Sequence, residues 1–143
     1  MKKITLDWVT YNLTPVEDKQ KHITVTWASG KTYKLSEPCI NKKNEFKDET
    51  FFTHKEAVKQ YSLPNISEWN DMIEWNLRDF ITDFPGDYDT DGTGPHNSNA
   101  LAYYWASDTS GSLARRLSLY SSVGAHLYID YQNKGFQVRE LIK

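Results

Sequence analysis

The sequence predicts a domain of the α+β class, and three observations lead to this assignment. Apolar and polar residues alternate near both ends of the chain, as in half-buried strands. Two helix-start signatures lie between these regions, and each precedes apolar residues with helical spacing. Strands and helices are therefore segregated along the chain, which favours a mainly antiparallel sheet over a parallel one. With 143 residues, the chain predicts a single domain over residues 1–143.

The first forty residues predict three strands. Ile4, Leu6 and Trp8 alternate with polar neighbours and predict a first strand, with one apolar face. Residues 22–27 alternate in the same way and predict a second strand. Ser29-Gly30 is a turn signal, so residues 32–35 are expected to return as the other half of a hairpin.

Two capping boxes predict the helices. Thr53 and Glu56 are spaced to bond each other's backbone amides, and a short helix is expected to run to about residue 60. Asn65 and Glu68 repeat this spacing ahead of a longer helix, which Pro85-Gly86 ends. The apolar stripe of the longer helix consists of Ile66, Trp69, Met72, Ile73, Leu77, Phe80 and Ile81.

Residues 86–99 form a long polar loop with calcium-like spacing of acids. Asp87, Asp89 and Asp91, followed by Gly92, match the first half of an EF-hand loop, in which alternate carboxylates wrap around the ion. The twelfth position, which needs a bidentate carboxylate, is Ser98. Two interpretations remain open: a free acidic turn, or a calcium site completed by other loop oxygens.

Three strands are expected after this loop, and they carry the predicted binding residues. The first contains Leu117 and Leu119, the second contains residues 127–131, and the last contains Phe136 and Val138 after a turn at residues 133–135. Tyrosine and serine are abundant in the hairpin that the first two of these strands form, as they are in evolved binding surfaces. The candidate ligand-binding residues are Trp75, Arg115, Arg116, Tyr120, His126, Tyr128 and Tyr131. The alternative is an ordinary exposed strand face, with Trp75 covered by a loop.

Composition excludes several functional classes. The formal net charge of −2 argues against general nucleic-acid binding, which needs a basic face. No apolar run approaches the roughly 18 residues that span a membrane, and no apolar signal-peptide region follows Met1-Lys2-Lys3. Cys39 is the sole cysteine, so an internal disulfide and a multi-cysteine zinc site are excluded. No nucleophile elbow or phosphate loop is present, and the sequence therefore predicts a protein that is not an enzyme.

Three motifs resemble those of a known family. Leu63-Pro64 followed by Glu68-Trp69, then Tyr104-Trp105-Ala106-Ser107, then residues 134–139 (Lys-Gly-Phe-Gln-Val-Arg) occur in the order LPxxxEW, YWxS and GFxVR. This pattern resembles the C-type-lectin-like domains of the bacterial and phage FISUMP/Lcl type, over residues 50–143. The resemblance implies terminal strands side by side, two flanking helices, a strand at the second motif and a long loop region that contacts ligands.

The same resemblance implies a function. Such domains are mostly binding modules, so we expect a phage virion surface, decoration or receptor-binding protein, or alternatively a bacterial adhesin whose leader is absent from this chain. The expected partner is a protein or a cell-surface glycan, and virion parts are often trimeric. Enzymes on this fold depend on paired cysteines, which this chain lacks. Glu37-Pro38-Cys39 and Trp69-Asn70-Asp71 do not reproduce the sugar-binding tripeptides of animal lectins, so calcium at the acidic loop is the one cofactor considered.

Overall fold

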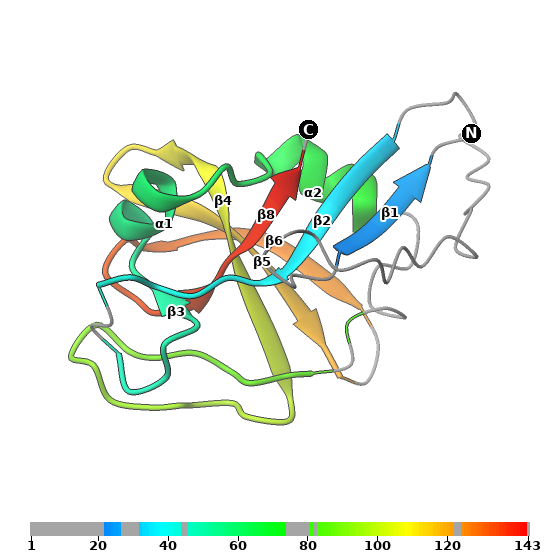
Figure 1. Cartoon of the computed structure of the whole chain (residues 1–143). Coiled ribbons are helices and arrows are strands. Elements are labelled where there is room, and N and C mark those ends of the chain that lie inside the picture. The colour runs from blue at the N-terminus through cyan, green and yellow to red at the C-terminus, as the bar shows by residue number, and fades with distance from the viewer. Residues whose placement is uncertain are drawn as a thin grey trace.

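The computed structural model describes residues 22–26, 32–43, 46–73, 81, 83–121 and 124–142 (Figure 1). The predictions for Ile4, Leu6 and Trp8, for the turn at Ser29-Gly30, and for Trp27, Trp75, Leu77 and Phe80 fall outside these residues. Within them, the chain folds into two sheets and two helices, which confirms the α+β class.

The first sheet contains the predicted hairpin. Strands β1 (His22–Thr26) and β2 (Thr32–Pro38) pair antiparallel from His22↔Ser36 to Thr26↔Thr32. Strand β8 (Arg139–Ile142) pairs antiparallel with the other side of β2, so that the order is β1-β2-β8. The earliest described strands and the end of the chain therefore lie side by side (Figure 1).

The second sheet has five strands in the order β3-β7-β4-β5-β6. They are β3 (Phe51–Phe52), β7 (Phe136–Gln137), β4 (Leu101–Ser110), β5 (Leu113–Tyr120) and β6 (Ala125–Tyr131). All neighbours are antiparallel except β4 and β7, which pair in parallel at Tyr104↔Gln137. The single last strand predicted from Phe136 and Val138 was wrong, because the chain passes from one sheet to the other at Val138.

Both capping boxes are present. Helix α1 (His54–Gln60) begins after Thr53, whose side chain accepts from the Glu56 amide while the Glu56 carboxylate accepts from the Thr53 amide. Ahead of helix α2 (Ile66–Ile73), Asn65 Oδ1 accepts from the Glu68 amide at 2.8 Å, and the Asn65 amide donates to Glu68 Oε1 at 2.9 Å. These local bonds satisfy amides that have no partner inside a helix.

Apolar packing covers both faces of β4. On one face, Trp69 and Met72 of α2 pack against Tyr104, with the Trp69 and Tyr104 rings stacked at 5.6 Å. Ile81, predicted to continue this helix, is buried in the same cluster but is not helical. On the other face, Trp105 packs against Phe136 and donates its indole N–H to the Phe52 carbonyl at 2.7 Å.

The two helices and the long loop occupy different sides of the molecule. Figure 1 shows α1 and α2 along one side and the loop of residues 83–100 along the opposite side. No helix in the part of the chain that the structure describes is both long and apolar enough to cross a membrane.

Candidate binding surface

The register of β5 and β6 divides the predicted ligand-binding residues between two faces of the sheet. Arg116 lies opposite Tyr128 and Ser118 lies opposite His126, so these four side chains and Tyr120 share one face. Arg115 lies opposite Ile129, and Leu113 lies opposite Tyr131, which places Arg115 and Tyr131 on the other face. The predicted hairpin residues therefore lie on two faces of the sheet, because consecutive strand residues point to opposite sides.

Arg116 is largely buried and connects the two strands of the β5–β6 hairpin. Its Nε donates to Asp130 Oδ2 at 3.0 Å, and Nη1 donates to the Ser118 hydroxyl. Its guanidinium lies 5.2 Å from the ring centroid of Tyr103 and 5.9 Å from that of Tyr128. Only 12% of the Arg116 side chain is exposed. The charge of Arg116 is compensated inside the protein, and its guanidinium packs against the ring of Tyr128 and helps to position it.

Three aromatic side chains on the same sheet face remain open to solvent. Tyr128 is 55% exposed and Tyr120 is 38% exposed. His126 is exposed as well, and its ring stacks on Tyr128 with 5.3 Å between centroids and 22° between planes. We name Tyr120, His126 and Tyr128 the aromatic platform. It presents flat, partly polar rings on a paired strand backbone, which loses little conformational entropy on binding.

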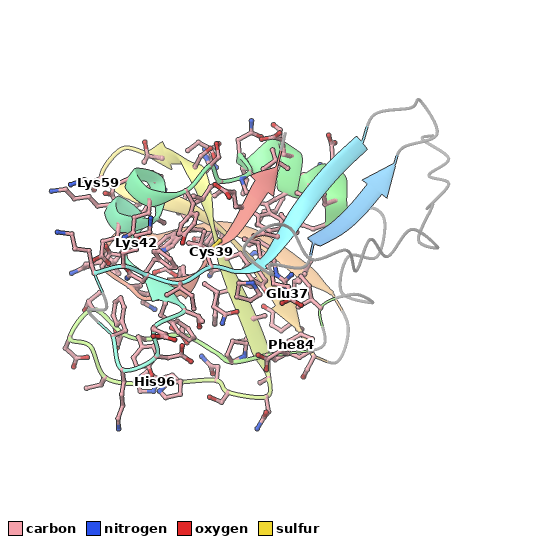
Figure 2. All side chains as sticks on the ribbon, viewed as in Figure 1. Glu37, Cys39, Lys42, Lys59, Phe84 and His96 are labelled. Atoms are coloured by element: carbon pink, nitrogen blue, oxygen red, sulfur yellow. The ribbon has the colours of Figure 1, made fainter. Side chains whose placement is uncertain are left out.

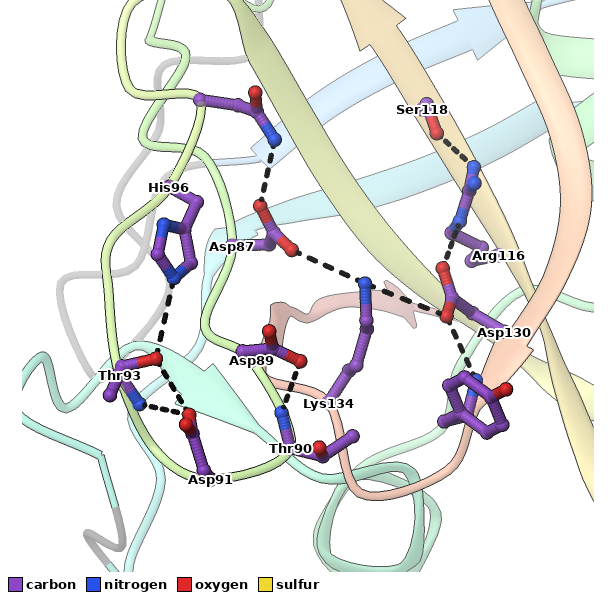
Figure 3. A network of polar contacts seen from close by, with 12 residues as sticks. Asp87, Asp89, Thr90, Asp91, Thr93, His96, Arg116, Ser118, Asp130 and Lys134 are labelled. Atoms are coloured by element: carbon purple, nitrogen blue, oxygen red, sulfur yellow. Dashed lines mark hydrogen bonds and ion pairs between the residues drawn. The ribbon is translucent and has the colours of Figure 1, made fainter.

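A chain of charges links the hairpin to the long loop (Figure 3). Lys134 Nζ lies 3.8 Å from Asp130 Oδ1 and 3.8 Å from Asp87 Oδ2. Burial raises the pKa of Asp87, against the lowering effects of the Asn97 side chain and Lys134. Burial also raises the pKa of the neighbouring Tyr103 to about 12, so this phenol stays protonated at neutral pH. The network contains two acids and two bases and is electrically balanced.

The carboxylates of the acidic loop are engaged separately. Asp87 faces Lys134, Asp89 Oδ1 accepts from the Thr90 amide at 2.7 Å, and Asp91 Oδ1 accepts from the Thr93 amide and hydroxyl (Figure 3). Hydrogen bonds from Thr93 lower the pKa of Asp91. Within the described ranges, no group of three or more His, Cys, Asp or Glu side chains is arranged to hold a metal ion. The calcium site remains a prediction, and the observed bonds are those of acidic turns.

Cys39 and His54, whose side chains can be reactive in other settings, are both buried. Cys39 is 1% exposed, and burial raises the pKa of its thiol, which keeps it in the unreactive protonated form (Figure 2). His54 is 3% exposed, and its Nε2 lies 2.8 Å from the Ala106 carbonyl. Both belong to the packed interior, away from the aromatic platform.

Sequence reasoning missed Tyr103, Asp130 and Lys134. Asp130 could have been found, because it is two residues from Tyr128 and therefore on the same strand face. Tyr103 and Lys134 depend on which strands and turns meet across the sheet. Arg115 has a long 3.9 Å contact to Asp108, with both side chains more than a third exposed, and contributes little rigidity.

Comparisons of the chain with protein-family models, with curated proteins and with solved structures gave no match.

Proposed function

We propose that this protein is a non-enzymatic binding module that recognises a protein or a cell-surface glycan through its aromatic platform. The observation that carries the proposal is the exposure of Tyr120, His126 and Tyr128 on a face of the sheet. The side chains of Arg116 and Ser118 on the same face are largely buried. Exposed aromatic rings on a fixed backbone are the usual anchors of recognition surfaces.

The chemistry of the platform favours a neutral ligand. Arg116 and Asp130 neutralise each other, and Lys134 is shared between two acids, so these charged residues of the described part of the chain compensate one another near the rings. A tyrosine ring offers an apolar face and a hydroxyl at its rim. The apolar faces of sugar rings and the side chains of an uncharged peptide surface both suit such a platform, and the hydroxyls supply hydrogen bonds at its edge.

A C-type-lectin-like fold is part of the proposal. It is supported by the adjacency of the terminal strand β8 to β2, by the two helices and by the long loop region. Four of the motif residues that carry the family resemblance, Leu63, Trp69, Trp105 and Phe136, are buried. In this proposal the motifs maintain the architecture, and the ligand is met by the strands that follow them.

For the biological setting, we favour a phage virion surface, decoration or receptor-binding protein. The alternative is a bacterial-surface adhesin, and both place the platform at the virion surface or outside the cell. This choice rests on the family resemblance, because the aromatic platform would suit a virion protein and a bacterial adhesin equally well. Capsid or tail genes beside the coding sequence would favour the virion, whereas cell-wall or secretion genes would favour the adhesin.

The test is a glycan-array and host-cell binding screen with a matched pair of variants. Replacing Tyr120 and Tyr128 together with Ala removes the platform and should weaken binding at least about tenfold, equivalent to about 1.4 kcal/mol. Tyr131→Ala removes a ring that is 62% exposed but lies on the opposite face, and binding should remain within about twofold. Equal losses in both variants, or a loss in Tyr131→Ala alone, would reject the platform as the site.

A further inference from the structure

Strand β6 forms one edge of the five-stranded sheet, and no described strand pairs with its outer side. It pairs with β5 at seven consecutive positions, from Leu113↔Tyr131 to Leu119↔Ala125, without a register shift. Natural edge strands usually discourage further pairing with a bulge, a proline or several charges. The sequence of β6, AHLYIDY, has one charged side chain, Asp130, and Arg116 already neutralises it. The edge is thus regular and largely uncharged.

The hydrogen-bond pattern shows which backbone groups of this edge point outward. The Tyr120 amide donates to the Gly124 carbonyl at 3.1 Å, which continues the β5–β6 ladder. Bonded pairs alternate in an antiparallel ladder, so His126 and Tyr128 bond inward to β5. Leu127 and Ile129 therefore turn their N–H and C=O groups outward. These groups are the ones that an added strand would bond.

At the Tyr131 end of β6, the outward backbone groups already have hydrogen-bond partners. The Tyr131 amide also points outward, but it donates to the Asp130 carboxylate at 2.9 Å. Its carbonyl accepts from the Lys134 amide at 3.2 Å in the following turn. An added strand must therefore centre its bonds on Leu127 and Ile129. The same contact brings the carboxylate of Asp130 to the outer edge of the strand.

We propose that β6 pairs antiparallel with β6 of a second copy of this chain, about a twofold axis at Tyr128. In this register Leu127 lies opposite Ile129 of the second copy, and the two symmetric pairs form four main-chain hydrogen bonds. His126 lies opposite Asp130 of the second copy, also twice. A donor ring thus meets a carboxylate at each end of the interface, and the two Tyr128 side chains lie next to each other at the centre.

The match of the His126 donor with the Asp130 carboxylate selects this register over its neighbours. A twofold axis at Leu127 would place His126 opposite Tyr128 and would leave Asp130 without the imidazole donor. An axis at Ile129 would require the Tyr131 amide, which Asp130 already occupies. Cross-strand pairs of opposite character stabilise a sheet, whereas a bonded amide must first lose its partner.

Edge pairing uses the backbone and does not cover the sheet face that carries the aromatic platform. The two aromatic platforms would lie on the same side of a continuous sheet and meet at the paired Tyr128 side chains. The dimer would present one doubled surface, so a repeated ligand could be held at two points with increased avidity. The pairing itself does not depend on the ligand, and it stands or falls separately from the proposed function.

Cysteine cross-linking tests the register. The two Tyr128 positions form a non-bonded pair with Cα atoms about 4.5 Å apart, within the disulfide range of about 4.4–6.8 Å. Tyr128→Cys should therefore give a covalent dimer under mild oxidation. Tyr131→Cys is the control, because Tyr131 is similarly exposed but its two copies would be about 20 Å apart at about 3.4 Å per residue. The native Cys39 is buried and should not interfere.

Cross-linking of Tyr131→Cys as fast as that of Tyr128→Cys would overturn the register. Sedimentation equilibrium of the unmodified chain tests the dimer itself. The interface is small, so dimer should accumulate as protein concentration rises toward about 1 mM. A monomer throughout this range, or a trimer in place of the dimer, would overturn the proposal.

A charge variant tests the His126–Asp130 pair. His126→Asp would place two carboxylates opposite each other at both ends of the interface and should raise the dimer dissociation constant at least about tenfold. Thr109→Asp introduces the same side chain at an exposed position of β4, away from the β6 edge, and should leave dissociation unchanged. Equal dissociation constants for His126→Asp and the unmodified chain would reject the pair.

Discussion

The Arg116–Asp130 pair gives a demanding test of how the binding surface is held. Asp130→Asn keeps the shape of the side chain but removes its charge, so the guanidinium loses its only carboxylate within hydrogen-bond distance among the described residues. Lys134 also loses one of its two acids, although Asp87 remains at 3.8 Å. The variant therefore leaves a cation largely enclosed between two tyrosine rings.

The expected loss of stability is about 2 kcal/mol. Breaking a fully buried ion pair costs about 3–5 kcal/mol, and breaking an exposed pair costs below about 1 kcal/mol. The side chains of Arg116 and Asp130 are 12% and 16% exposed, so the cost of breaking the pair lies between these limits. For a domain of this size, about 2 kcal/mol lowers Tm by about 7 °C.

Urea unfolding followed by tryptophan fluorescence measures the effect. The double variant Arg116→Met with Asp130→Asn should recover most of the loss, because Met keeps an apolar stem between the rings and no charge remains to be solvated. Glu37→Gln, at an exposed carboxylate, is the control and should change stability by no more than about 0.5 kcal/mol. A double variant less stable than Asp130→Asn alone would refute the reasoning.

Three further predictions concern other parts of the chain. Burial lowers the pKa of His54 from 6.5, so the stability that the neutral ring contributes is present above pH 6.5 and is lost as the pH falls through the lowered value. His54→Gln should therefore reduce the fall in the free energy of unfolding, measured with urea, between about pH 7 and 5. Gly86→Ala should destabilise the fold by several times the roughly 1 kcal/mol expected for Gly92→Ala, because both have positive φ but an added Cβ at Gly86 would meet the His96 carbonyl oxygen at 1.9 Å, whereas nothing lies within 4 Å of Gly92. Calorimetry with calcium at about millimolar concentration should give no saturable heat, because the Asp87 carboxylate is already paired with Lys134. A saturable heat would establish the calcium site.

Local chemistry made the helices predictable. The capping pairs Thr53–Glu56 and Asn65–Glu68 are complete within four residues, so their geometry follows from spacing alone. Strand β4 could not be found from alternation, because Tyr104, Trp105 and Ala106 are all buried and apolar side chains cover both of its faces. Only the family resemblance pointed to a strand at this position.

The candidate site was predictable in composition but not in arrangement. Tyrosine and serine content pointed to the hairpin, and three of its residues form the exposed platform. The adjacency of Arg115 and Arg116 already implied opposite faces, and this rule would have removed Arg115 and Tyr131 from the set. The contacts of Lys134 with Asp87 join distant segments, and such pairing depends on the tertiary fold rather than on local spacing.

The passage of the chain from β7 to β8 has a consequence for how the protein is made. Only Val138 separates the strand that pairs with β4 from the strand that pairs with β2, and its carbonyl accepts from the Cys39 amide at 2.8 Å. Residues 136–142 therefore complete both sheets at once. During translation, β2 and β4 must wait for this segment to leave the ribosome, and loops closed over such long stretches of chain form slowly. A nascent chain stalled before residue 136 would expose one unpaired edge of each of these strands and would be a substrate for chaperones.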